Sequence, residues 1–217
     1  GDLAQPLLEA GQWLLFSLVT LAMVLLASEI TTIRLRLRER NGQLAELLER
    51  IQDLAVKDEL TGLYSRRHAM ELLAKACGQA RRGAFLLAVG FVDLDHFKRI
   101  NDRHGHLFGD QVLVRFAELT RRYLGDKDMA ARLGGEEFLV MLPVIDMEQA
   151  LTSVERLMSA LRAQRFMAAP ALEVTASVGL TVVGHGENPD EVLVRADRLL
   201  YQAKAAGREG IITGGPP

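Results

Sequence analysis

The chain has 217 residues, one cysteine, a formal net charge of −2 and 49% apolar residues. This length accommodates one enzyme-sized domain and a further segment, since domains commonly contain about 100–200 residues. The single cysteine excludes an internal disulfide framework, and the Cys and His residues lack zinc-site spacing. A near-neutral charge and an aromatic content of 6% argue against a nucleic-acid partner, which would require a basic stripe or stacking platforms.

The N-terminal segment, residues 1–33, contains no Lys or Arg, and four arginines follow it between Arg34 and Arg40. Its apolar run, Trp13 to Ala27, is short for a membrane-spanning helix of about 20 residues, but extension to Ile33 reaches that length and includes Glu29. By the positive-inside rule the arginine flank is cytoplasmic. We therefore predict a membrane anchor that leaves the rest of the chain in the cytoplasm. The alternative is a cytoplasmic protein whose apolar helix is covered by a partner.

A heptad pattern runs through the same segment and continues over residues 34–56. Two apolar series, three residues apart, are Phe16, Met23, Ile30, Leu37, Leu44 and Ile51, and Val19, Leu26, Ile33, Leu47 and Leu54, with Arg40 as the one interruption. Such a seam is typical of a left-handed coiled coil. We predict a long helix that forms a homodimer, because the seam is too long to be covered by one small domain.

Residues 57–213 have the pattern of a globular domain. A helix is expected over 66–82 and a buried strand over 84–93, which is almost continuously apolar. Two helical stretches follow, divided by Gly105 and Gly109.

The second half of the domain shows further turn and cap signals. Segments 129–133 and 137–142 flank a Gly-Gly pair, which indicates a hairpin. A capping box at Asp146 and Gln149 precedes a helix with Ala150, Val154, Leu157 and Leu161 on its core face. The alternation of apolar and polar residues over 174–182 predicts a half-buried strand. A last helix is expected to begin at Asn188-Pro189 and to end at Gly207. The order β-α-α-β-β-α-β predicts an α/β (α+β) domain with a mostly antiparallel sheet flanked by helices.

Carboxylates gather at two predicted turns. Asp93 ends the first strand, Asp95 follows it, and Glu136 and Glu137 follow the Gly-Gly pair. Singly, Asp95 is a candidate helix cap and the glutamates a solvated turn. Taken with Asp93, however, the two glutamates suit one or two Mg²⁺ ions, which prefer carboxylate oxygens and leave positions open for phosphates.

Other residues could bind a nucleotide. A helix beginning at His96, Phe97 and Lys98 offers free N–H groups to phosphate, while Asn101 and Asp110 could recognise guanine. Lys204 and Arg208 could clamp terminal phosphates, or could simply compensate the dipole at a helix C-terminus. Singly, Asn101 and Asp110 are ordinary turn or capping residues.

Five stretches together resemble the GGDEF diguanylate cyclases over about residues 57–213. They are DELTGLYSRR (58–67), FVDLDHFKRIND (91–102), GHLFGDQVL (105–113), RLGGEEF (132–138) and ADRLLYQAKAAGR (196–208), with Glu136 where the signature has Asp. The resemblance implies metal ligation by Asp93, the Leu94 carbonyl, Glu136 and Glu137, with Mg²⁺ or Mn²⁺ as cofactor. It also implies that Glu136 accepts the proton of the attacking hydroxyl. For the substrate, it implies guanine recognition by Asn101, Asp110 and His106, and triphosphate binding by Phe97, Lys98, Lys204 and Arg208.

The function that this resemblance implies is condensation of two GTP into cyclic di-GMP and two pyrophosphates, by a homodimer of facing half-sites. Control would pass through the N-terminal helix, to which a regulatory protein could bind. For an anchored member of this family, the expected location is the bacterial inner membrane, with a cytoplasmic catalytic domain. Two alternatives remain: an inactive GGDEF module that binds nucleotide or a partner, and a one-substrate cyclase that makes cyclic GMP.

Many members of this family bind product at an Arg-x-x-Asp motif before the signature. Counting back from Gly134 gives Gly125 in place of the Arg, and Asp128 at the Asp position. Glycine cannot replace a guanidinium that binds phosphate and stacks on guanine. We therefore expect weak or absent product inhibition at this degenerate site.

Overall fold

The structure, a computed structural model, describes residues 56–80 and 86–216, together with residues 23, 25–26, 29–31 and 33–40. The chain divides into two compact units, Gly1–Asp53 and Leu54–Pro217. Over the described residues, none of the helices is long and apolar enough to cross a membrane. Much of the predicted anchor and of the heptad seam lies outside the described residues, so the anchor and the coiled coil stay predictions.

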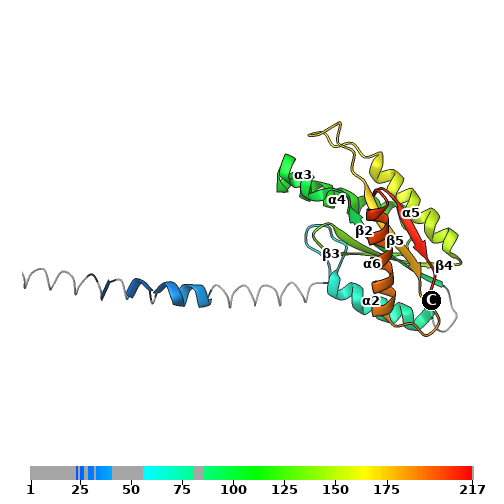
Figure 1. Cartoon of the computed structure of the whole chain (residues 1–217), viewed down its shortest axis with the longest axis horizontal. Helices are drawn as coiled ribbons and strands as arrows, with labels where there is room; N and C mark the ends of the chain where they lie inside the picture. The colour runs from blue at the N-terminus through cyan, green and yellow to red at the C-terminus, as the bar shows by residue number, and fades with distance from the viewer. Residues whose placement is uncertain are drawn as a thin grey trace, which may run out of the picture. The chain divides into compact units, whose positions relative to one another are not determined.

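The second unit contains a six-stranded sheet in the order β1-β3-β4-β2-β5-β6 (Figure 1). The strands are β1 (Tyr64–Ser65), β2 (Leu86–Leu94), β3 (Met129–Gly134), β4 (Glu137–Val144), β5 (Ala176–Val182) and β6 (Ile211–Gly214). The helices described in this unit are α2 (Arg66–Ala80), α3 (Phe97–His104), α4 (His106–Tyr123), α5 (Met147–Arg162) and α6 (Pro189–Ala205).

The predicted order of strands and helices is confirmed. The central pairs β3–β4, β4–β2 and β2–β5 are antiparallel, as expected. Two edge strands were not predicted: β1 pairs with β3 and β6 with β5, both in parallel. Each edge strand is too short to show a period of its own in the sequence.

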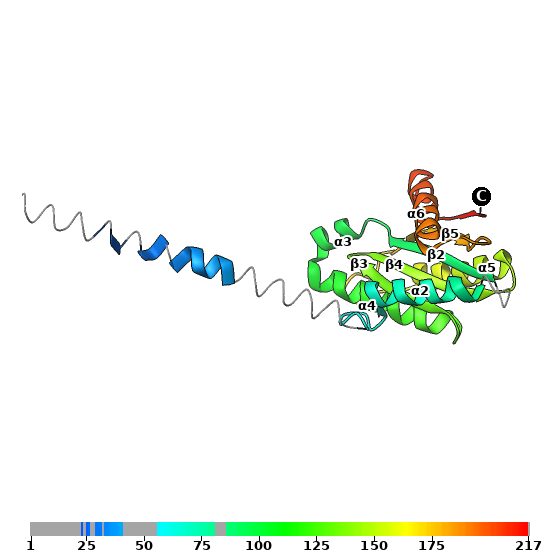
Figure 2. The same cartoon turned by 90° about the horizontal axis from the view of Figure 1, so that it is seen from below.

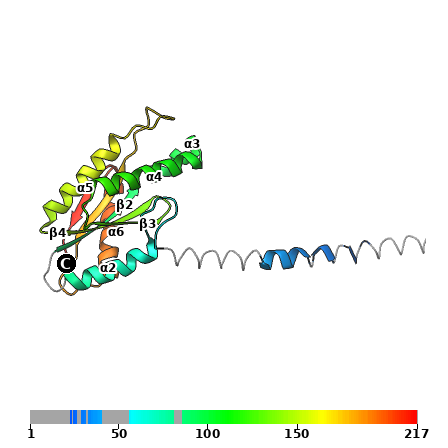
Figure 3. The same cartoon turned by 180° about the vertical axis from the view of Figure 1, so that it is seen from behind.

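Helices cover both faces of the sheet, α4 and α5 on one side and α2 and α6 on the other (Figures 1 and 3). Figure 2, seen from below, has α2 and α6 on the near side. The alternation of side chains along β2 explains why both faces are apolar. Ala88 and Val92 enter one core cluster, and Leu87 and Val89 enter the other. Asp93 shares the parity of Leu87 and Val89, so it belongs to the face that α6 covers.

Two predicted helix signals have a different outcome from that expected. Gly109 does not divide the helices: it lies inside α4, and Gly105, with φ 83°, makes the break alone. Asp146 does cap α5 by accepting from the Gln149 N–H, but the Gln149 side chain accepts from Ile145 N–H rather than completing a box at Asp146. The start of α6 has a complete capping box, formed by Asn188 and Glu191.

Strand β5 is buried on both sides, so the prediction of a half-buried strand was wrong. The residues expected to face solvent, Ser177, Gly179 and Thr181, lie under α6. A Cβ at Gly179 would come within 2.2 Å of the Ala196 carbonyl oxygen and of the Leu200 nitrogen. Glycine therefore permits α6 to pack directly on the strand backbone, and this contact places the C-terminal end of α6 beside the end of β2.

Candidate functional site

The acidic residues predicted to act together meet at the C-terminal end of β2. Asp93 lies opposite Glu137 in the antiparallel register of β2 and β4. The Leu94 N–H donates to the Glu136 carbonyl oxygen at 3.3 Å, which fastens the strand end to the hairpin turn. Gly134 and Gly135 both have positive φ values, 148° and 51°. The turn therefore requires the glycine pair, and the pair sets the position at which Glu136 leaves the sheet.

Asp93 forms an ion pair with α6. The Lys204 Nζ lies 2.7 Å from the Asp93 Oδ2, and the Asp93 side chain is 9% exposed. Burial raises the pKa of the Asp93 carboxyl above its ordinary value, an effect that Lys204 and Arg208 oppose and the nearby charge of Asp95 reinforces. The site thus contains a buried carboxylate whose charge is neutralised incompletely, an environment that attracts a further cation.

The donor chemistry of this end of the sheet suits a hard divalent cation. The Asp93 and Glu137 side chains and the paired backbones of Leu94 and Glu136 bring carboxylate and carbonyl oxygens to one place. Mg²⁺ prefers such ligands. Over the described parts of the chain, no three His, Cys, Asp or Glu side chains are already close enough to hold a metal. A cation bound by Asp93 would take over from the ammonium group of Lys204, and the carboxylates of Glu136, which is half-buried, and Glu137, which is exposed, could then turn toward it.

The hairpin turn is held by an arginine that the sequence reasoning did not single out. Arg132 on β3 donates to the Gly135 carbonyl oxygen from Nε at 3.0 Å and from Nη2 at 2.8 Å. Its Nη1 lies 3.4 Å from both carboxylate oxygens of Asp58. Asp58 in turn accepts from the N–H and hydroxyl of Thr61. Asp58 and Arg132 both belong to stretches that resemble the family, 58–67 and 132–138, and this was the one sign in the sequence of a role for them. That they pair with each other is visible only in the fold.

The predicted phosphate-binding segment begins a helix, as expected. His96 precedes α3 in a left-handed conformation with φ 57°, and makes no side-chain cap to the helix. The Phe97 side chain is buried in the core, so what it can offer a ligand is its backbone N–H. Lys98 is exposed on the first turn of α3. This arrangement leaves N–H groups and one cation available to an anion.

The two candidate guanine-reading residues lie on adjacent helices, α3 and α4. The Asn101 Oδ1 is buried and has no hydrogen-bond partner among the described residues. A Cβ at Gly109 would come within 1.9 Å of that oxygen, so Gly109 leaves the space that the Asn101 side chain occupies. A buried acceptor without a donor is costly, and an N–H from a bound base would satisfy it. Gly109 is therefore a site residue that the sequence reasoning mistook for a helix break.

Asp110 borders a groove of about 580 Å³ beside α4. Leu60, Leu107 and Val114 contribute apolar side chains to the same groove. An apolar groove with a carboxylate at its border suits a flat base that presents N–H donors at one edge. His106, the first residue of α4, is exposed.

Asp95 is not a helix cap. Its carboxylate accepts from the hydroxyls of Thr175 and Ser177, and from the Glu209 N–H beyond the end of α6. Arg208 immediately precedes Glu209; it is exposed, and its charge is among those that lower the pKa of Asp93. Lys204 and Arg208 thus lie on the Asp93 side of the sheet, as the clamp hypothesis requires.

The positions of the degenerate product-binding motif form a tight turn before β3. The Gly125 N–H donates to the Asp128 Oδ2 at 2.6 Å, and the Asp128 N–H donates to the Gly125 carbonyl oxygen at 3.0 Å. Burial raises the pKa of the Asp128 carboxyl, while the Gly125 N–H opposes the rise. Asp128 therefore serves its own turn in this structure.

Two buried carboxylates give opposite predictions for stability. Because the pKa of Asp93 is raised, the folded state binds its proton more readily than the unfolded chain, and ionised Asp93 destabilises the fold at neutral pH. Glu187 has a lowered pKa, chiefly because Arg195 donates to it, so ionised Glu187 stabilises the fold.

Asp93→Asn should raise the melting temperature at pH 7, or leave it unchanged. Glu187→Gln, which weakens the buried pair, should cost about 2–3 kcal/mol.

Thermal and urea unfolding of both variants at pH 7 checks this pair of predictions. The stability that Glu187 contributes should disappear as pH falls through its lowered folded-state pKa. The penalty from Asp93 should diminish as pH falls through its raised pKa. A clear loss of stability in Asp93→Asn at neutral pH would contradict the interpretation that ionised Asp93 destabilises the fold.

Comparison with known proteins agrees with this geometry. The family model "Diguanylate cyclase, GGDEF domain" matches residues 55–210. Diguanylate cyclase DgcP of Pseudomonas aeruginosa is 37% identical over 190 residues, which cover 79% of this chain and 28% of DgcP. The chain thus spans well under half of that relative.

Two solved structures are similar over most of this chain. One contains the coiled coil and GGDEF domain of DgcB from Caulobacter crescentus in complex with c-di-GMP; it has a TM-score of 0.70 and 29% identity, over 84% of this chain and 99% of that chain. The other is diguanylate cyclase SiaD in complex with its activator SiaC from Pseudomonas aeruginosa, with a TM-score of 0.70 and 30% identity, over 97% of this chain and 81% of that chain. The fold, the site and these matches together establish that the chain belongs to the GGDEF family.

Proposed function

We propose that this protein is a diguanylate cyclase, which condenses two GTP into cyclic di-GMP and releases two pyrophosphates. The observation that carries the proposal is the meeting of Asp93, the Gly-Gly turn with Glu136 and Glu137, and Lys204 at one end of the sheet. This group combines oxygen ligands for a divalent cation with a cation for phosphate. Relatives named diguanylate cyclases support the assignment.

Each half-site would bind one GTP between the strand end and the helices. Asn101 and Asp110 would hydrogen-bond the guanine edge, the unpartnered Asn101 Oδ1 gaining a donor, with His106 at the mouth of the base site. The free N–H groups of Phe97 and Lys98, with the Lys98 ammonium, would hold phosphate oxygens. Lys204 and Arg208 would bind the terminal phosphates and neutralise the pyrophosphate as it leaves.

The oxygens of Asp93, Leu94, Glu136 and Glu137 would hold Mg²⁺ or Mn²⁺. Such an ion, when bound, polarises the α-phosphate and lowers the pKa of a coordinated hydroxyl. Glu136, half-buried beside the Gly-Gly turn, would accept the proton of the attacking 3′-hydroxyl. Arg132 would keep this carboxylate in place by holding the adjoining Gly135 carbonyl.

Two other functions are distinguishable by product and by stoichiometry. An inactive GGDEF module would bind GTP without releasing pyrophosphate. A one-substrate cyclase would make cyclic GMP, at a rate per molecule that does not depend on dimer formation. The intact set of acids and cations around Asp93 favours catalysis over an inactive module. Relatives named diguanylate cyclases favour the two-substrate reaction over a one-substrate cyclase.

The role of Glu136 gives the first activity test. With GTP and Mg²⁺, the wild-type chain should produce cyclic di-GMP, and Glu136→Ala should reduce the rate by about a thousandfold or more, because it removes both a metal ligand and the proton acceptor. The fold should be retained, since the side chain lies on an exposed turn. Glu148→Ala, an exposed acid on α5, is the matched control and should be fully active. Near-normal turnover in a folded Glu136→Ala protein would refute the assignment.

We also propose that the N-terminal helix brings two catalytic domains together and regulates them. The described seam residues support a covered surface: Met23, Leu26, Ile30, Ile33 and Leu37 are 68%, 59%, 42%, 50% and 54% exposed in the isolated chain. Exposed apolar residues at heptad positions favour a partner helix. The DgcB structure contains a coiled coil, and SiaD is bound to an activator, so a regulatory protein on this helix is a reasonable second partner. We also propose that residues 13–33 lie in the bacterial inner membrane, because their sequence is largely apolar and arginines follow it on one side.

Removal of the helix tests dimerisation and membrane attachment together. A protein of residues 54–217 should be monomeric, and its specific activity should fall at least about tenfold at micromolar concentration and rise with concentration, because two half-sites must meet. The full chain should be dimeric and should sediment with membranes. Unchanged dimerisation and activity after truncation would show that the helix does not bring the catalytic domains together, and a full chain that stays out of the membrane fraction would exclude the anchor.

We further propose that product inhibition through the Gly125–Asp128 turn is weak. The inhibitory arginine is absent, and Asp128 already accepts the Gly125 N–H. Without a guanidinium, the turn lacks a group that can bind phosphate and stack on guanine.

Titration of the Glu136→Ala protein with cyclic di-GMP measures this site without turnover. The expected result is no binding at low micromolar concentration, and an unchanged result in Asp128→Ala. Gly125→Arg should restore binding, by at least about tenfold in affinity. Tight binding that disappears in Asp128→Ala would show that the site survives without its arginine.

A further inference from the structure

We propose that Asp95 is a positioning residue for the phosphate-binding end of the site. Its buried carboxylate holds the backbone turn that presents Arg208. The inference rests on the proposed cyclase function and deepens it, since it gives a role to an acid outside the metal-binding and guanine-binding sets.

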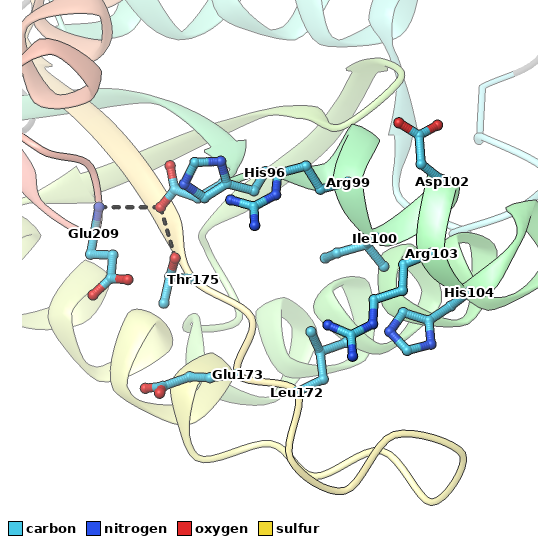
Figure 4. A pocket seen from close by; sticks show the side chains of 11 residues that line it. His96, Arg99, Ile100, Asp102, Arg103, His104, Leu172, Glu173, Thr175 and Glu209 are labelled. Atoms are coloured by element: carbon cyan, nitrogen blue, oxygen red, sulfur yellow. Dashed lines mark hydrogen bonds between the residues drawn. The ribbon is translucent and has the colours of Figure 1, made fainter.

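Asp95 is fixed on every side. The residue is 4% exposed, and its backbone N–H donates to the Thr175 carbonyl oxygen at 2.9 Å. The Ser177 hydroxyl lies 2.7 Å from its Oδ1, and the Thr175 hydroxyl 2.9 Å from its Oδ2. The same Oδ2 accepts from the Glu209 N–H at 3.2 Å, and dashed lines mark the contacts of Thr175 and Glu209 in Figure 4. A buried carboxylate with all these donors has little freedom to move.

The turn that it holds has an uncommon backbone. Gly207, Arg208 and Glu209 follow α6 with φ values of 119°, 69° and 55°. Two consecutive non-glycine residues in the left-handed region persist only where the surroundings determine their conformation. The Arg208 N–H donates to the Ala203 carbonyl oxygen at 3.1 Å, and the Gly210 carbonyl accepts from Val178 N–H at 2.9 Å. Among the described hydrogen bonds of this turn, the Asp95 bond is the one in which a side chain accepts from its backbone.

The consequence for the substrate follows from the position of Arg208. The direction of its side chain depends on the backbone conformation of this turn, which the hydrogen bond from the Glu209 N–H to Asp95 helps to fix. Release of the Glu209 N–H would let both residues relax toward right-handed φ values, and Arg208 would leave the phosphate side. Contacts to guanine, on α3 and α4, would be unaffected. Asp95 therefore controls triphosphate binding without touching substrate.

The two rival roles of Asp95 make different predictions. If its negative charge acted on the metal or substrate, Asp95→Asn would be as damaging as Asp95→Ala. If it only stabilised the fold, the folded fraction of each variant would have normal kinetics. A positioning role instead predicts rescue by Asn, because its carbonyl oxygen can accept from Glu209 while its amide donates to the Ser177 hydroxyl, which can turn.

The experiment measures GTP kinetics of the full chain with Mg²⁺. Asp95→Ala should raise KM for GTP about tenfold, and Asp95→Asn by less than about threefold. Affinity for GMP, which lacks the terminal phosphates, should change less than about twofold. In an Arg208→Ala background, Asp95→Ala should raise KM by less than about twofold, since the residue through which it acts is gone. Glu187→Gln, another buried carboxylate, is the control that lowers stability and leaves KM unchanged.

The possible outcomes separate this inference from the proposed function. A wild-type chain that makes no cyclic di-GMP refutes the cyclase. An active wild type with additive effects of Asp95→Ala and Arg208→Ala, or without rescue by Asp95→Asn, overturns the positioning role and leaves the cyclase intact. If Asp95→Ala does not fold, Asp95→Ser, whose hydroxyl is too short to reach Glu209, replaces it in the same cycle with the same expected non-additivity.

Discussion

The close approach of α6 to the backbone of β5 at Gly179 is the contact on which the site depends. A side chain at this position would overlap the Ala196 carbonyl and the Leu200 amide. Since α6 is held against the centre of the sheet there, its last turn carries Lys204 to within 2.7 Å of Asp93. Even a small displacement of this helix would separate Lys204 from the acidic end of β2. The geometry of the site is therefore a consequence of helix-on-sheet packing, and only secondarily of the loops around it.

Asp93 and Asp95 show how two acids of the same strand parity acquire different chemistry. Both lie toward the α6 side and both are buried. Asp95 has all its donors supplied by the protein, so its place is fixed and it has nothing left to offer a ligand. Asp93 has one lysine and a raised pKa, and retains capacity for a cation. Two residues apart, one carboxylate stabilises the architecture and the other is kept available at a cost in stability.

A structural feature of this molecule can be predicted from the sequence when its signal lies in neighbouring residues, and not when it depends on residues far apart in the chain. Local signals predicted the central strands, the helices and the Gly-Gly hairpin correctly, because periodicity and turn chemistry are properties of neighbouring residues. They failed for β5, where Ser177, Gly179 and Thr181 have the composition of a solvent face but are covered by α6. They also failed for Gly109, whose purpose is the space beside Asn101 on another helix. The Arg132–Asp58 and Asp95–Glu209 contacts join residues far apart in the chain, so no local pattern announces them.

These two long-range contacts hold two different parts of the site, the hairpin turn before Glu136 and the turn that carries Arg208. On the hairpin side, Arg132 joins the Gly135 carbonyl, next to Glu136, to Asp58 at the start of the catalytic unit. On the phosphate side, Asp95 joins the Arg208 turn to the centre of the sheet. Both contacts lie inside the second unit, but the first ends at Asp58, only a few residues after the predicted coiled-coil segment 34–56. A displacement of Asp58 would therefore act on the turn that carries Glu136 and leave the phosphate clamp in place. The proposed proton acceptor and the proposed triphosphate clamp are thus anchored to different parts of the fold, so that one could move without the other.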